Sequence, residues 1–421
     1  MGLIKIDLDR ASDNHVYTPG SIVSGTVYYH ITVEQQKVDL VELKFAGVIN
    51  TVVFRSSGSG NHRSTHKYED NLALFEFRKP LFRGPFTLQP QRLEFPFQFQ
   101  FPEVCEFQRG SPSKHDYIES GRSQFPPSFQ HSTGSRRHSH RCSVSYTLEV
   151  KVNGQSLFRK EKEEVFLPFI PIESSSSNAP QLSNVRFPMQ SWTHRCLGPE
   201  DQNISLRHKM KSIFNDSPEM RKPSITFTPT IYVPTSLGPG QSAPISFSIA
   251  HRTMNPADPK NPTFRLSHVR MRLRAHVDFR VATKVFGSGH EEHRKEDAGA
   301  FSYNPVKAFL PLDNTPIRLS SDFRLENFKQ ENSGVVADFK TYTIAVRHDL
   351  KMKMIIEHVE SRQIFEAEAT IPFTVLPMNA SPDLPPPFTG ASASVQLAGP
   401  SVEPVPAYEH PPTYDSKPIA V

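Results

Sequence analysis

The sequence predicts an all-β protein, with two antiparallel β-sandwich domains in tandem and a disordered, proline-rich tail at the C-terminus. Apolar and polar residues alternate strictly in many short segments, and this period of two is that of a β-strand. The 38 prolines of the chain separate these segments, whereas the interior of a long helix does not tolerate proline. A length of 421 residues is sufficient for two hydrophobic cores of ordinary size.

The first sandwich is expected over residues 1–172. In residues 143–152 the valine, tyrosine and leucine side chains share one face, and the polar side chains share the other. This pattern is typical of a strand with one buried and one solvated side. Residues 38–48 and 95–102 repeat it, and a Pro-Gly turn signal at 18–25 precedes both.

The second sandwich is expected over residues 224–377. Residues 268–281 place seven apolar side chains on one face and mostly basic side chains on the other. Residues 365–377 alternate in the same way, and the segment 237–243 carries the Gly-Pro-Gly signal of a turn. Many short alternating strands without regular helices are typical of antiparallel sandwiches.

Two segments lack this alternation. Residues 173–223 are expected to form a linker between the domains. Within it, residues 200–214 have apolar side chains at roughly helical spacing among basic ones, which fits either a short basic amphipathic helix or a linker turn packed on one domain. Residues 378–421 are rich in Pro, Ala, Ser and Gly. Such a segment buries too little apolar surface to offset its ordering entropy, and we expect it to be disordered.

Composition argues against several functional classes. The formal net charge of +5 is mild for this length and does not indicate nucleic-acid binding. The sequence has no run of about 18 apolar residues that would span a membrane. Three widely spaced cysteines suit reduced thiols in the cytosol better than a disulfide framework. Because no catalytic or metal-ligating spacing is present, we expect no enzymatic activity, no cofactor and no metal ion.

The clearest functional motif lies in the tail. Pro411, Pro412 and Tyr414 form a complete PPxY sequence, which suits a WW domain because neighbouring prolines favour the polyproline II conformation that docks into its aromatic groove. Pro406 and Tyr408 form a related unit that lacks the first of the paired prolines. If the partner has tandem WW domains, two linked units provide avidity, since the second docking step is intramolecular.

A second candidate site is cationic. Arg270, Arg272, Arg274 and Arg280 share the polar face of one expected strand. Side chains two residues apart on a strand are about 6.6–6.8 Å apart, so these arginines would form a continuous stripe. The stripe could contact phosphate groups or anionic lipid headgroups. The alternative is a solvated sheet face whose arginines pair with acidic residues of neighbouring strands.

The order of these segments resembles that of the α-arrestins, the arrestin-domain-containing adaptors, of fungal type. In the first half the resemblance is carried by residues 16–27, 41–48, 93–102, 125–130 and 144–152. In the second half it is carried by residues 232–249 and 342–377. The polar segments 55–70 and 109–124 are longer than the family pattern requires.

The resemblance implies a ubiquitin ligase-substrate adaptor. Such a protein recruits a WW-domain HECT-type ubiquitin ligase through its tail and contacts the cytoplasmic segments of membrane transporters or receptors, which promotes endocytosis and protein transport. It also implies ubiquitination of the adaptor itself and a cytoplasmic protein recruited peripherally to the plasma membrane and endosomes. Two alternatives stay open: a retromer-like or pH-sensing arrestin-fold scaffold, and a binder of anionic lipids at the membrane surface.

Overall fold

The structure is a computed structural model that divides into two units, Met1–Ser381 and Pro382–Val421. All of the second unit lies outside the described residues. Within the first unit the structure describes residues 3–9, 15–32, 36–57, 64–107, 117, 121–133, 139–154, 161–173, 180–193, 224–253, 263–281, 290–303, 309–310, 314–328, 335–359 and 362–379.

The predicted all-β class is confirmed for the described residues, in which the only helical element is the short 3-10 helix η3, Leu325–Asn327. The strands of the first half are β1 (Leu3–Leu8), β2 (Ile22–Ile31), β3 (Gln36–Ser57), β4 (Ser64–Leu88), β5 (Gln91–Gln100), β6 (Cys105–Phe107), β7 (Gly121–Ser123), β8 (Phe129–Thr133), β9 (His140–Asn153), β10 (Glu161–Phe166) and β11 (Ile172–Glu173). Those that follow are β12 (Leu182–Arg186), β13 (Gln190–Thr193), β14 (Ser224–Pro234), β15 (Ser236–Leu237), β16 (Ala243–Thr253), β17 (Phe264–Val281), β18 (His290–Tyr303), β19 (Phe309–Leu310), β20 (Ile317–Phe323), β21 (Phe339–Lys340), β22 (Ile344–His358), β23 (Ile364–Val375) and β24 (Met378–Asn379).

The first half is a sandwich of two antiparallel sheets. One sheet has the order β1-β2-β5, and the other has the order β10-β9-β3-β4, with β8 also paired to β9. The inward residues of both sheets, among them Val27 of β2, Phe45 of β3 and Leu148 of β9, are fully buried in one core. The alternation in residues 143–152 therefore placed the buried face of β9 correctly.

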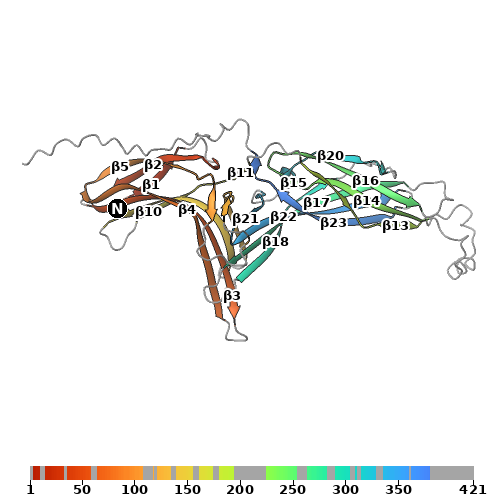
Figure 1. The fold of residues 1–421 in the computed structure, drawn as a ribbon, viewed down its shortest axis with the longest axis horizontal. Helices are drawn as coiled ribbons and strands as arrows, with labels where there is room; N and C mark the ends of the chain where they lie inside the picture. The colour runs from red at the N-terminus through yellow and green to blue at the C-terminus, as the bar shows by residue number, and fades with distance from the viewer. Residues whose placement is uncertain are drawn as a thin grey trace, which may run out of the picture. The chain divides into compact units, whose positions relative to one another are not determined.

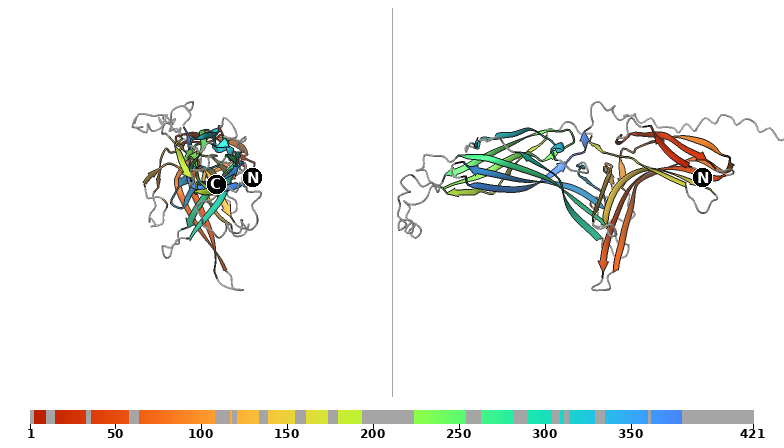
Figure 2. Two further views of the ribbon diagram at one scale, coloured as in Figure 1. Left: turned by 90° about the vertical axis from the view of Figure 1, so that its right-hand side faces the viewer. Right: turned by 180° about the vertical axis from the view of Figure 1, so that it is seen from behind.

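The second half is also a sandwich. A five-stranded sheet has the order β12-β14-β16-β20, with β13 also paired to β14. A seven-stranded sheet has the order β15-β23-β22-β17-β18, with β19 also paired to β17 and β21 to β22. Its core joins residues such as Phe247 of β16, Leu273 of β17 and Met352 of β22. Figure 1 shows the strands of this half from β14 onward in green to blue, and the view from behind in Figure 2 shows the green strands lying along the blue ones.

Two strands belong to both cores. Residues Phe264 to Leu273 of β17 pack in the core of the second half, but Val277 and Phe279 of the same strand pack in the core of the first half. The strand β22 is divided in the same way, with Ile344 in the first core. Hydrogen bonding joins the halves as well, because the Thr51 hydroxyl donates to the carbonyl oxygen of Arg280 at 3.1 Å.

The segment expected as a linker is partly built into the second sandwich. Residues 182–186 and 190–193 form β12 and β13, which pair antiparallel with β14. These strands are too short for their alternation to be recognised, although Phe187, between them, is buried in the second core. The helix considered at residues 200–214 lies outside the described residues.

A short parallel pair links the end of the first half to the end of the second. Ile172 of β11 pairs with Met378 of β24, and Glu173 pairs with Asn379. The last described residue of the chain, Asn379, is therefore held beside Glu173.

One buried hydroxyl provides a test of the first sandwich. Tyr146 is 1% exposed, and its hydroxyl donates to the carbonyl oxygen of Pro126 at 2.6 Å. Removing the hydroxyl leaves this carbonyl without its partner, so we expect Tyr146→Phe to lower the free energy of unfolding by about 1–3 kcal/mol. Urea unfolding followed by circular dichroism measures the change. An unchanged stability would show that another donor replaces the hydroxyl.

Candidate functional site

The residues of the tail motif lie outside the described residues; they are Pro406, Tyr408, Pro411, Pro412 and Tyr414. The second candidate, the arginine-bearing strand, is described over its whole length as β17. It lies between β22 and β18 in the seven-stranded sheet. The candidate site that the structure describes is therefore the face of this sheet that points away from the core, which we call the outer face.

The predicted alternation along β17 is confirmed. Val269, Met271 and Leu273 are buried in the core, while Arg270 is exposed and Arg272 is partly exposed. The neighbouring strand β22 alternates in register, with Lys351 and Lys353 pointing to the outer face between the buried Leu350, Met352 and Met354. The outer face is thus a charged surface shared by several strands.

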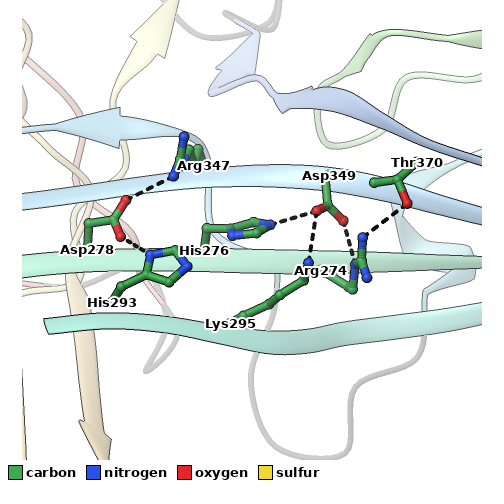
Figure 3. Close-up of polar contacts among 8 residues, drawn as sticks. All are labelled: Arg274, His276, Asp278, His293, Lys295, Arg347, Asp349 and Thr370. Atoms are coloured by element: carbon green, nitrogen blue, oxygen red, sulfur yellow. Dashed lines mark hydrogen bonds and ion pairs between the residues drawn. The ribbon is translucent and has the colours of Figure 1, made fainter.

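Arg274 does not form part of an open cationic stripe, because it is paired with an acid. Its Nε donates to Asp349 of β22 at 2.6 Å, and a second guanidinium nitrogen donates to the Thr370 hydroxyl at 3.3 Å. His276 lies 2.7 Å from the other carboxylate oxygen of Asp349, and the Lys295 amine lies 3.5 Å from that oxygen. Figure 3 shows the side chains of Arg274, His276 and Lys295 converging on one carboxylate.

A second acid is surrounded in the same way one step along the strand. The Asp278 carboxylate contacts His293 of β18 on one side, and Arg347 of β22 at 3.5 Å on the other (Figure 3). Asp278 and Asp349 therefore neutralise the part of the outer face nearest to the first sandwich. At Arg274 the structure therefore shows the alternative considered from the sequence, a sheet face whose arginines pair with acidic residues of neighbouring strands.

The inclusion of Arg280 in an exposed stripe was wrong. This residue is on the expected polar side of β17, but its side chain is only 4% exposed. Its Nε donates to the carbonyl oxygen of Tyr342 at 3.2 Å, and its guanidinium lies 5.6 Å from the centre of the Tyr117 ring. The first sandwich packs against this end of β17, so Arg280 is part of the contact between the halves and is not available to a lipid surface.

Two lysines of β22 lie beside the remaining arginines, Arg270 and Arg272, and the sequence analysis did not identify them. Arg270 is directly opposite Lys353, and Arg272 is directly opposite Lys351, on adjacent strands. We call these four residues the basic quartet. Lys351 contacts Glu368, and Lys353 lies 2.7 Å from Glu366, both on β23. The alternation of β22 could have indicated that both lysines are exposed, but only the strand pairing shows that they adjoin the arginines.

The acid at the centre of Figure 3 has a shifted pKa. Burial alone would raise the pKa of Asp349, but hydrogen bonds from Arg274 and His276, together with the charge of Lys295, outweigh it and hold the pKa below its usual value. A carboxyl group whose pKa is lower in the folded state stabilises the fold above the pKa of the unfolded chain, about 3.9. This stabilisation is lost as the pH falls through the folded-state value.

We therefore expect Asp349→Asn to lower the free energy of unfolding by about 1–3 kcal/mol at pH 7, because Arg274 and Lys295 lose their anionic partner and His276 loses its carboxylate contact. The difference from wild type should shrink as the pH falls below about 4. Urea unfolding at several pH values tests this. A suitable control is Asp322→Asn, which removes the exposed ion pair with Arg324 and should leave the free energy of unfolding nearly unchanged. A difference that persists unchanged at pH 3 would contradict the assignment.

Other site classes receive no support from the described part of the chain. Among its residues, no group of three or more His, Cys, Asp or Glu side chains is arranged to hold a metal ion. In the same residues, no helix has the length and apolar character needed to cross a membrane. Cys105 and Cys142 are buried free thiols.

A scan of protein-family models found none that matches this chain, and a search of curated proteins found no significant match.

Proposed function

We propose that this protein is an adaptor that brings a WW-domain ubiquitin ligase of the HECT type to a membrane protein. In this proposal the β-sandwich body engages a cytoplasmic segment of a transporter or receptor, and the tail binds the ligase. The observation that carries the proposal is the complete PPxY sequence Pro411-Pro412-Thr413-Tyr414, located beyond the last strand of an all-β body.

The chemistry of the motif supports binding to a WW domain. Consecutive prolines favour polyproline II before binding, so little conformational entropy is lost on docking. The Tyr414 ring then fills a pocket next to the proline groove. The unit of Pro406 and Tyr408 lies close enough in sequence to engage a second WW domain of the same ligase and to add avidity.

The body supports the proposal at the level of fold. Two antiparallel sandwiches in tandem are what the resemblance to α-arrestins implies, and the structure contains two such sandwiches. Because one fold hosts many functions, this agreement leaves the adaptor role to be tested by experiment. The mechanism we propose is proximity: the adaptor raises the local concentration of ligase around the client and itself makes or breaks no bonds.

In the proposed complex the tail would tether the ligase to the body near the β11–β24 pair. From Asn379 to Pro411 the chain spans at most about 110 Å when fully extended. A ligase bound at Tyr414 is therefore confined to a volume around the β11–β24 pair, which includes the body and its client. We propose that the protein is cytoplasmic and reaches the plasma membrane and endosomes through the client it binds.

Proximity labelling in cells tests the proposal. The intact chain is compared with a chain ended at Ser381, which retains β24 and its pairing with β11. We expect the intact chain to label both a WW-domain ligase and membrane proteins, and the shortened chain to label the membrane proteins alone. Equal labelling of ligases by both chains would refute the proposed role of the tail.

A further inference from the structure

Two histidines lie side by side on the outer face of the seven-stranded sheet. His276 of β17 and His293 of β18 are on paired strands, and their ring centres are 5.6 Å apart. Nε2 of His276 lies 2.7 Å from Asp349, and Nδ1 of His293 contacts Asp278, so the two rings lie between two acids (Figure 3). We propose that His276 and His293 together bind a divalent transition-metal ion such as Zn²⁺.

The two carboxylates determine which ring nitrogens are available to a metal ion. An ionised carboxylate can only accept a hydrogen bond, so the ring nitrogen that faces it carries the N–H. In a neutral imidazole the lone pair is then on the other nitrogen, which is Nδ1 in His276 and Nε2 in His293. A carboxylate bonded to the far nitrogen is the usual support of a metal-ligating histidine. Both rings have this support.

The two lone pairs point into the space between the rings. The nitrogens of an imidazole face nearly opposite sides of the ring, and Asp349 and Asp278 lie at the two outer ends of the row (Figure 3). Nδ1 of His276 is buried and has no hydrogen-bond partner within the described part of the chain. A buried polar atom without a partner costs free energy, which an ion bound at this nitrogen would offset.

The separation of the rings suits a shared metal ion. An ion bonded to a ring nitrogen at about 2.0–2.1 Å lies roughly 3.2 Å from the ring centre, so two rings on a tetrahedral ion have centres about 5.2 Å apart. The observed separation of 5.6 Å is therefore close to the value that binding requires. The His293 side chain is 52% exposed, which gives an ion access from solvent.

The surrounding charges favour an ion that is held by nitrogen ligands. Arg274, Lys295 and Arg347 adjoin the two acids, and the basic quartet follows Arg274 along β17. Such a surface disfavours Ca²⁺ and Mg²⁺, which need several oxygen ligands. Imidazole suits Zn²⁺, Cu²⁺ and Ni²⁺.

The site would be an open one. A set of three protein ligands is absent from the described residues, so water would complete the coordination of an ion held by this pair. We therefore expect weaker binding than at a closed structural zinc site, which has four protein ligands.

A bound ion would join β18, at the end of the sheet order, to β17. The sequence gave no sign of this site, because the two histidines are brought together by strand pairing and not by local spacing. The inference goes beyond the adaptor role and does not depend on it. Metal binding is measured on the intact chain without ligase or client, so either hypothesis can fail without the other.

The experiment is calorimetric titration of the intact chain with Zn²⁺. Wild type should show a binding step that both His276→Gln and His293→Gln abolish. Asp278→Asn, which removes the support of His293, should weaken the same step by about 10–100-fold. The control is His30→Gln, at an exposed position of β2 in the first sandwich, and it should bind Zn²⁺ as wild type does.

A change of ligand makes the test independent of folding defects. His293→Cys replaces one metal ligand by another, so this variant should still bind Zn²⁺. With Co²⁺ it should also show a sulfur-to-cobalt charge-transfer absorption that wild type lacks. The proposal is overturned if wild type does not bind Zn²⁺, or if binding survives in either glutamine variant. It is also overturned if His30→Gln loses the same step, or if the cysteine variant shows no such absorption.

Discussion

The Tyr414→Ala variant is expected to lose most of its affinity for a WW domain. The aromatic ring is the part of a PPxY motif that fills a pocket, and truncating such an interface anchor costs about 2 kcal/mol or more, which is roughly thirtyfold in affinity. Calorimetric titration of the full-length chain with a single WW domain measures the loss. The body should be unaffected, because Tyr414 lies beyond the last strand of the sandwiches.

Tyr408→Ala is the matched control within the tail. Its unit lacks the first of the paired prolines, so its loss should have little effect on a single WW domain. With tandem WW domains, however, Tyr408→Ala should reduce the apparent affinity if both units dock, since the avidity term is then removed. If Tyr414→Ala binds a single WW domain as tightly as wild type does, the motif is not the binding site.

The second large effect concerns the aromatic core of the first sandwich. Phe45 of β3 is fully buried, and its ring centre lies 4.8 Å from that of Phe75 and 4.9 Å from that of Phe101. Phe45→Ala removes a large buried side chain and leaves a cavity between the two sheets. We expect it to lower the free energy of unfolding by about 3–5 kcal/mol, measured by urea denaturation.

Phe166→Ala is the exposed counterpart on the same sandwich. The Phe166 side chain is 66% exposed at the end of β10, so its removal should change stability by less than about 0.5 kcal/mol. Similar effects of the two substitutions would mean that Phe45 is not at the centre of the core. Since the halves share residues of β17 and β22, Phe45→Ala should lower the stability of both sandwiches together.

The sequence was sufficient to predict the fold class because strand periodicity is a local property. The alternation in residues 143–152 and 268–281 correctly identified the buried faces of β9 and β17. The sequence predicts a linker at residues 182–193 because β12 and β13 are short and separated by Pro188. Their place in the sheet depends on pairing with β14, which no local pattern encodes.

The same limit applies to the charged face. Alternation placed Arg280 on the polar side of β17, but it does not reveal that the first sandwich covers that end of the strand. Nor does it reveal which residues of β22 and β23 lie beside each arginine. Arg274 has Asp349 as its neighbour, whereas Arg270 has Lys353. The pairing of β17 with β22 therefore places Arg274 beside an acidic residue and Arg270 beside a basic one.

The most direct test of the central claim is whether the chain holds a client and a ligase at the same time. Analytical ultracentrifugation of the intact chain with a tandem WW fragment and a labelled cytoplasmic segment of a membrane protein measures this. The proposed function predicts a ternary complex in which each partner binds about as tightly as it does alone. Mutual exclusion of the two partners, or binding of the WW fragment that survives loss of both Tyr408 and Tyr414, would contradict it.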